Sequence, residues 1–212
     1  MVLLEHSEMR GLAEANALKA ANAFSNLPEL AKMLGFSSLK DFQRYLDGKR
    51  VLDLGSGYNG LAVGVILAGL DTKVVSVNPH FKDPFFGIHQ KGTIEYTRRI
   101  YYPLVSPKAL EEARVESLCH THSAFAHDLP FGEEFDLVID NLAVLAYIKE
   151  ETAPVLKDSL TEELRVLIPG GLIRAHTLGA VLRPQSWRVE LLREMGLNYR
   201  VLDPSLLEIT KC

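Results

Sequence analysis

Residues 51–60 read VLDLGSGYNG, and residues 61–68 continue as LAVGVILA. An apolar run that carries one carboxylate leads into a glycine-rich turn, and a second apolar run of helical length follows the turn. This order is typical of a buried parallel strand that passes through a tight loop into a helix. Glycines let the backbone turn sharply and let a ligand approach closely, because they have no Cβ. We therefore expect a ligand site where this loop meets the free N–H groups of the following helix.

From residue 49 onward, strand-like and helix-like segments alternate. Strands are expected at residues 50–54, 73–77, 122–126, 136–140 and 172–176. Helices are expected at residues 61–68, 106–118, 153–166 and 187–195. Residues 198–202 and 206–210 read as a closing antiparallel pair. Such alternation predicts an α/β fold with a doubly wound, mostly parallel sheet and helices on both of its faces.

The first 48 residues are rich in alanine and leucine, and they predict helices at residues 5–24, 28–35 and 39–46. Pro28 suits the first turn of a helix. Ser38, followed three residues later by Asp41, resembles a capping box. We therefore expect N-terminal helices that form a cap at residues 1–48, followed by an α/β domain at residues 49–212.

Three motifs are arranged in a recognisable order. They are Asp-x-Gly-x-Gly at residues 53–57, HDLPFGEEFDLVID at 127–140 and ELRVLIPGGLI at 163–173. In order and spacing they resemble the class I S-adenosylmethionine-dependent methyltransferase family, and the resemblance covers most of the chain from residue 49. It implies a Rossmann-like sheet with a reversed last strand, S-adenosylmethionine as the cofactor, and methyl transfer as the reaction.

The glycine pattern also allows other interpretations. Gly55, Gly57 and Gly60 satisfy the Gly-x-Gly-x-x-Gly spacing of a dinucleotide site, which predicts a nicotinamide oxidoreductase. Asp53 and the Pro-Gly-Gly motif at residues 169–171 favour the methyltransferase instead. A glycine-rich turn in some other α/β protein is the structural alternative.

The resemblance implies a set of cofactor-binding residues around the first strand. Asp53 is expected to hold the charged methionine end of the cofactor through charge-assisted hydrogen bonds, or else to cap N–H groups of its own loop. Gly55, Ser56 and Gly57 are expected to lie against the sugar and amino-acid portions. Asn59 stands where the family usually has its third glycine.

Two further positions depart from the family pattern. Asn78 ends the second strand, where the family has an acid that accepts from both ribose hydroxyls. An amide pairs with a diol more weakly, so Asn78→Asp is expected to tighten cofactor binding. The adenine-binding acid of the family falls on Phe125 here, which makes Asp128 the candidate for the adenine amino group, or simply a solvent-facing loop residue. With Asn59, these departures keep open a non-catalytic methyltransferase-like protein that binds a nucleoside or a partner protein.

The acceptor side of the cleft follows the fourth strand in the family. Asp140 lies there and counts among both the catalytic and the cofactor-binding candidates; the other catalytic candidates are His127, as a general base, and Tyr147. Residues after Asp140 lack the Asn-Pro-Pro-Tyr motif of many nucleic-acid methyltransferases, which favours a small-molecule acceptor. His120, His122 and His127 do not have the spacing of a zinc site, so no metal is expected.

The segment at residues 79–118 is long for the connection after a second strand. Its first part carries many aromatic and cationic residues, among them Arg98, Arg99, Tyr101 and Tyr102. Such side chains suit a planar or anionic acceptor, so this segment is interpreted as a lid insertion and acceptor wall. The alternative is an ordinary helix with its aromatic residues in a satellite core.

Composition narrows the range of partners. The 212 residues carry a net charge of −4, which gives no general attraction to nucleic acid. No apolar run reaches the ~18 residues of a membrane span, and the N-terminus does not read as a secretory signal. Cys119 and Cys212 form no disulfide framework, so a reduced, cytoplasmic setting is expected. The sequence leaves the oligomeric state open.

Overall fold

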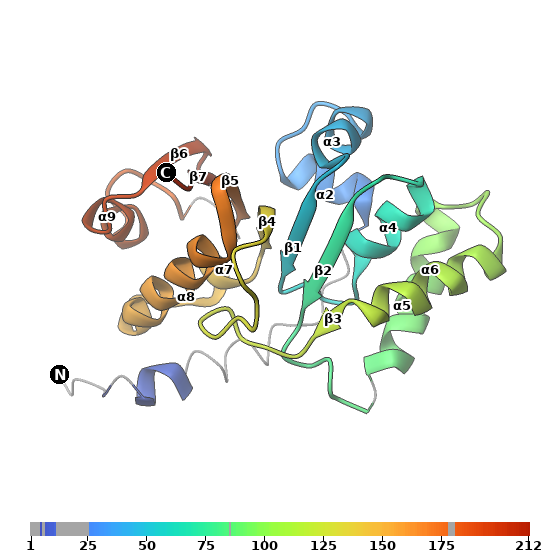
Figure 1. Cartoon of the computed structure of the whole chain (residues 1–212), viewed down its shortest axis with the longest axis horizontal. Helices are drawn as coiled ribbons and strands as arrows, with labels where there is room; N and C mark the ends of the chain where they lie inside the picture. Colours follow the sequence, from blue (N-terminus) through green and yellow to red (C-terminus); the bar gives the residue numbers. More distant parts are fainter. Residues whose placement is uncertain (1–4, 6, 12–25, 85, 178–180) are drawn as a thin grey trace.

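The computed structural model describes residues 5, 7–11, 26–84, 86–177 and 181–212. Its centre is a seven-stranded sheet with the strand order β3-β2-β1-β4-β5-β7-β6 (Figure 1). The strands are β1 (Arg50–Leu54), β2 (Lys73–Val77), β3 (Thr121–His122), β4 (Phe135–Asn141), β5 (Leu167–His176), β6 (Asn198–Asp203) and β7 (Leu206–Thr210). Strand β7 runs antiparallel to β5 and β6, whereas β1–β2, β1–β4, β2–β3 and β4–β5 are parallel. The predicted α/β fold with a mostly parallel sheet and a reversed last strand is confirmed.

Helices cover both faces of this sheet. They are α2 (Leu27–Met33), α3 (Leu39–Leu46), α4 (Gly60–Ala68), α5 (Phe86–Tyr101), α6 (Pro107–Cys119), α7 (Val144–Tyr147), α8 (Ala153–Val166) and α9 (Trp187–Glu194), with a 3-10 turn at Glu150–Thr152. Leu52 and Leu54 of β1 pack in the core with α8, while Val51 packs in the core with α2, α3 and α4. Because side chains alternate along a strand, Asp53 shares the face of Val51.

The N-terminal helices begin at side-chain caps. Asn26 Oδ1 accepts from the N–H of Glu29 at 3.0 Å, which starts α2. Ser38 Oγ accepts from the N–H of Asp41 at 3.1 Å, so the cap predicted before α3 is confirmed. The helix predicted at residues 5–24 lies mostly outside the described residues, although residues 7–11 within it are helical.

Arg174 of β5 fixes these helices to the sheet. Its Nε donates to the carbonyl of Leu34 at 3.0 Å, and its guanidinium carbon lies 4.5 Å from the ring centre of Phe36. Its Nη1 also pairs with Glu208 of β7 at 3.1 Å. One buried cation therefore joins the segment between α2 and α3 to the middle of the sheet.

Three segments differ in detail from the sequence-based expectation. Strand β3 has only two residues, because the chain turns away beyond it and closes a turn in which the N–H of Asp128 donates to the carbonyl of Phe125 at 3.0 Å. Strand β5 begins at Leu167, so the Pro-Gly-Gly motif lies inside the strand rather than ahead of it. The long connection after β2 contains the 16-residue helix α5.

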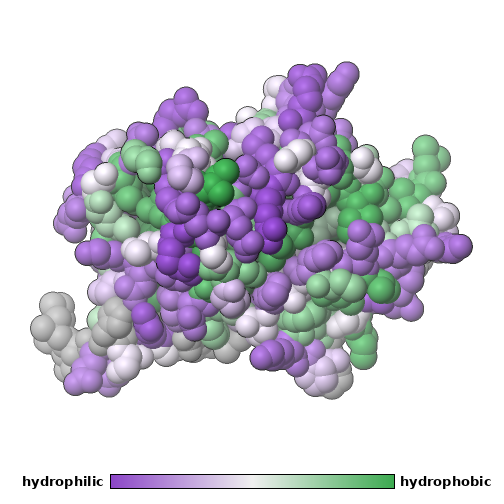
Figure 2. All heavy atoms as spheres, in the orientation of Figure 1, coloured by the Kyte–Doolittle hydropathy of each residue, from purple (hydrophilic) through white to green (hydrophobic). Residues whose placement is uncertain are grey.

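The surface is mostly polar, and apolar residues show at the end of the molecule that carries α5 and α6 (Figure 2). Ile88, Leu104 and Val115 are the most exposed large apolar side chains among the described residues. In the described part of the chain, no helix is both long and apolar enough to cross a membrane.

Candidate cofactor site

The loop between β1 and α4 lies at the carboxyl end of β1, between the neighbouring strands β2 and β4, where open α/β sheets bind ligands. Gly55 and Gly57 have φ values of +62° and +53°, a region that L side chains rarely adopt. A Cβ on Gly55 would lie 2.5 Å from the Cβ of Ala143, in the loop after β4. Gly55 therefore allows the predicted cofactor loop and the predicted acceptor-side loop to touch.

Asn59 takes the left-handed conformation, with φ +62°, at the position where the family usually has glycine. Asparagine tolerates this region better than most residues. Its buried amide donates to Thr121 Oγ1 at 2.8 Å and accepts from Ser56 Oγ at 3.1 Å. The side chain of Asn59 therefore ties the loop to β3, and the side chain of Ser56 is engaged in the same network.

Asn78 is also buried and engaged inside the chain. Its Nδ2 donates to the carbonyl of Gly57 at 2.5 Å, and its Oδ1 accepts from the N–H of His80 at 2.8 Å. Its side chain is 0% exposed. The amide thus fixes the glycine turn from the end of β2.

Asp53 stands out because its carboxyl group has no hydrogen-bond partner among the described residues and is only 4% exposed. Burial raises the pKa of Asp53 to about 8, because a charge without a partner is costly away from water. A cation placed beside this carboxyl group would lower its pKa again, because the cation favours the ionised form. The group is therefore suited to receive a positively charged ligand atom.

Asp140 caps the short helix α7. Its carboxylate oxygens accept from the N–H groups of Ala143, Val144 and Leu145 at 3.0, 2.9 and 3.2 Å. Burial raises the pKa of Asp140 to about 6, against the lowering effect of these three hydrogen bonds. The side chain is 0% exposed, so its observed contacts hold the loop after β4 in place.

Glu163 of α8 lies behind Asp140 and was not singled out from the sequence. Neither of its side-chain oxygens has a hydrogen-bond partner in the described structure, and the residue is 0% exposed. Burial, and then the neighbouring Asp140, raise the pKa of Glu163 well above its usual value. The only sequence signal is its spacing from Leu156 and Leu160, which places an acid on the apolar face of the helix.

The remaining predicted residues lie around the turn before β4 or outside the described side chains. Asp128 is exposed, and the pKa of Arg165 is raised mainly by its hydrogen bond to Glu162, with the charge of Asp128 as a minor cause. His127 is half-buried and stacks on Phe125 with the ring centres 5.6 Å apart. The side chain of Tyr147 lies outside the described part of the structure. No three His, Cys, Asp or Glu residues gather as a possible metal site within the ranges that the structure describes.

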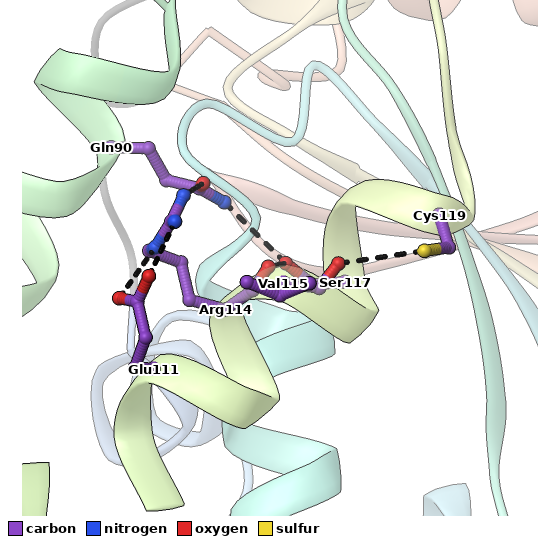
Figure 3. Close-up of polar contacts among 6 residues, drawn as sticks. All are labelled: Gln90, Glu111, Arg114, Val115, Ser117 and Cys119. Atoms are coloured by element: carbon purple, nitrogen blue, oxygen red, sulfur yellow. Dashed lines mark hydrogen bonds and ion pairs between the residues drawn. The ribbon is translucent and has the colours of Figure 1, made fainter. Parts of the chain in front are cut away.

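Helix α5 is anchored beside the glycine loop by Gln90, which is 0% exposed. Gln90 Nε2 donates to the carbonyl of Tyr58 at 3.3 Å and to Ser117 Oγ at 3.4 Å. Its Oε1 accepts from Arg114 of α6 at 3.2 Å, and Arg114 in turn binds Glu111 in two contacts of 2.7 and 2.9 Å (Figure 3). This network joins α5, α6 and the loop into one unit.

The predicted lid residues are described only in part. The hydroxyl of Tyr102 accepts from the N–H of Leu27 at 3.4 Å, and it lies 3.2 Å from where a Cβ on Gly64 would stand. Tyr102 thus packs between α2 and α4. The side chains of Arg98, Arg99 and Tyr101 lie outside the described part of the structure.

No family model matches the sequence, and no curated protein matches it. Solved structures resemble the chain. The aminoglycoside resistance methyltransferase NpmB1 is 19% identical with a TM-score of 0.51, over 90% of this chain and 95% of that one. The antibiotic-resistance methyltransferase Kmr is 15% identical with a TM-score of 0.49, over 89% and 94%. An S-adenosylmethionine-dependent methyltransferase from Aquifex aeolicus is 14% identical with a TM-score of 0.49, over 98% and 97%.

The strand order, the reversed β7 and the likeness to NpmB1 agree on one architecture. The chain has the class I methyltransferase fold. Because one fold hosts many functions, the activity has to be argued from the site itself.

Proposed function

We propose that this chain binds S-adenosylmethionine at the loop between β1 and α4 and transfers its methyl group to a small molecule. The observation that carries the proposal is Asp53, a buried carboxyl group with no described hydrogen-bond partner near the carboxyl end of β1. The ammonium of the cofactor's methionine end suits this group. The positive charge of this ammonium would offset the cost of burying an ionised carboxylate, a cost that otherwise keeps Asp53 protonated.

The loop beside Asp53 supports the same proposal. Gly55 and Gly57 add no side chains to the turn, and α4 begins at Gly60, so the first N–H groups of a helix lie at the end of the loop. When bound, the cofactor supplies a methyl group already activated by its sulfonium. The chain then contributes binding at Asp53, orientation by the rigid turn, and exclusion of water by α5, which Gln90 fixes beside the loop.

A small-molecule acceptor is favoured by charge and by the acceptor-side loop. The chain is acidic overall, with a net charge of −4, which disfavours a nucleic-acid substrate. In this proposal Asp140 is a positioning residue, because its oxygens already hold the loop after β4 through three N–H groups. His127 is the proposed base for an acceptor that has to lose a proton.

One observation favours a second function, a methyltransferase-like protein that binds a nucleoside or a partner without turnover. At the end of β2, where the family uses an acid for the ribose, the Asn78 amide is engaged with Gly57 and His80. Cofactor binding without methylation of any acceptor supports this second function. Methylation of a small molecule supports the first.

The proposal is tested by calorimetry with S-adenosylhomocysteine. Wild-type protein should bind it, and Asp53→Asn should weaken the binding by about 1.5–3 kcal/mol, because a charged hydrogen bond is lost. The matched control is Asp71→Asn, the same change at an exposed carboxylate, which should leave the affinity unchanged. Folded protein that binds no ligand at millimolar concentration would contradict the proposal, and tighter binding of NAD would favour an oxidoreductase.

A further inference from the structure

Asn78 lies where a ribose contact is expected, yet its side-chain amide makes two hydrogen bonds within the chain. Nδ2 donates to the carbonyl of Gly57 at 2.5 Å, and Oδ1 accepts from the N–H of His80 at 2.8 Å. The side chain is 0% exposed. A buried group whose donor and acceptor are both engaged gains little from a further partner, and a ligand would have to displace an internal bond to reach it.

An amide is also the side chain that this position requires. An ionised carboxylate in its place would still accept from His80, but it has no proton to donate to the Gly57 carbonyl. Two oxygens would then face each other in a buried place, which is unfavourable. An apolar side chain would leave the carbonyl of Gly57 and the N–H of His80 without these partners.

The bond to Gly57 belongs to a set of contacts that fix the whole loop. Gly57 has a φ of +53°, and the N–H of Ser56, its neighbour, donates to the carbonyl of Val77 at 3.2 Å. On the other side, Asn59 donates to Thr121 at 2.8 Å. The loop is therefore held to β2 and to β3 by side chains and backbone of the chain itself.

We infer that Asn78 is a positioning residue that sets the glycine turn and does not read the ribose of the cofactor. The inference rests on the proposed function, because it assumes a nucleoside ligand at this loop. Its consequence for specificity is that the ribose hydroxyls gain nothing from the side chain at the end of β2. This differs from the carboxylate pattern, in which that side chain accepts from both hydroxyls.

The test is a double-mutant cycle between the residue and the ligand. Dissociation constants of S-adenosylhomocysteine and of its 2′-deoxy and 3′-deoxy analogues are measured for wild type and for Asn78→Ala. We expect Asn78→Ala to weaken the binding of all three ligands by the same factor. The ratio of the dissociation constant of each deoxy analogue to that of S-adenosylhomocysteine should then differ from the wild-type ratio by less than threefold. If Asn78 contacts a hydroxyl, that ratio shifts by threefold or more, which overturns the inference. Asn78→Ser, which keeps a short donor, takes the place of Asn78→Ala if the latter does not fold.

Asn78→Asp adds a measurement that does not depend on activity. We expect it to lower the melting temperature and to weaken S-adenosylhomocysteine about fivefold or more, since the bond to Gly57 is lost. Asn198→Asp, the same change at an exposed position in β6, is the control and should change neither. Tighter binding by Asn78→Asp would overturn the inference and restore a ribose contact. No binding of the parent ligand to folded wild type would instead contradict the proposed function, and the inference would fall with it.

Discussion

At the scale of single residues, the structure contains two buried acids that have no hydrogen-bond partner among the described residues. Asp53 lies at the glycine loop and Glu163 lies behind the acceptor-side loop, and burial raises the pKa of both. Unpaired buried carboxyl groups cost stability whenever they ionise, so they persist only where something else compensates. For Asp53 we propose a cationic ligand as that compensation. For Glu163 the neighbouring Asp140 does not compensate for burial, because its charge raises the pKa of Glu163 further.

The raised pKa of Asp53 predicts a pH-dependent effect of Asp53→Asn on stability. The folded-state pKa is about 8, whereas the ordinary value is 3.8, so the folded wild type holds a proton that the unfolded chain has lost. The wild type therefore loses stability as the pH rises from about 4 to about 8, by up to ~1.4 kcal/mol per pH unit from this group. Asp53→Asn removes this loss, and its melting temperature relative to wild type should rise between pH 5 and pH 8.5.

Thermal melts of wild type, Asp53→Asn and the control Asp71→Asn across that pH range check the expectation. The control should follow wild type, because its carboxylate is exposed. A difference between Asp53→Asn and wild type that stays constant with pH would show that Asp53 is ionised in the folded protein.

The sequence predicts that a strand carrying Asp53 leads into a glycine turn, because strand, carboxylate and glycines are local features of one short stretch. The structure has this arrangement, and the roles of these residues in binding stay predictions. The sequence did not foresee that Asn78 reaches back to Gly57 or that Asp140 caps α7. The Asp140 cap is a local contact within residues 140–145, and the sequence predicts no helix there. The Asn78 contact depends on where two segments meet after folding, and no residue pattern within either segment encodes it. Glu163 was missed for the same reason, since only the packed helix shows that its side is buried.

At the scale of elements, the attachment of the N-terminal helices to the sheet depends on Arg174. Arg174→Ala removes the bond to the Leu34 carbonyl and the contact with Phe36, and it leaves Glu208 with one cation fewer. We expect a loss of about 2–4 kcal/mol in the free energy of unfolding, measured by urea denaturation. Arg200→Ala is the matched control, because Arg200 pairs with the same Glu208 from a side chain that is 70% exposed. It should cost about 1 kcal/mol or less, and equal losses in the two variants would show that the contacts to α2 and α3 add nothing.

The elements themselves were largely predictable, and each exception has its own cause. Helix α3 begins after the cap predicted at Ser38, and α6 begins at Pro107, one residue after the start predicted at residue 106. Strand β3 is shorter than predicted because its partner on the sheet ends at Val77, so residues beyond His122 have no strand to pair with. The sequence of the segment that forms α5 predicts either a lid or a plain helix, because its aromatic and charged residues suit both.

At the scale of the whole molecule, the sheet brings the ends of β1, β2 and β4 to one edge, with the glycine loop in the middle (Figure 1). Alternating strands and helices already predicted this arrangement, since parallel strands with right-handed crossovers leave few topologies. The antiparallel pairing of β6 with β7 is predicted from residues 198–210 themselves, whereas the reversed last strand of the sheet is what the family resemblance implies. The small-molecule acceptor stays a prediction from charge and composition, which do not identify it.

Proton release on ligand binding tests the central claim, a cationic ligand group held by Asp53, most directly. Calorimetry of S-adenosylhomocysteine binding at pH 7, in two buffers with different ionisation enthalpies, reports the number of protons released. Because the pKa of free Asp53 is about 8, the carboxyl is mostly protonated at pH 7 and should lose about one proton when the ligand's ammonium binds beside it. We predict release of about one proton by wild type and none by Asp53→Asn. Binding by wild type with the same heat in both buffers would contradict the account.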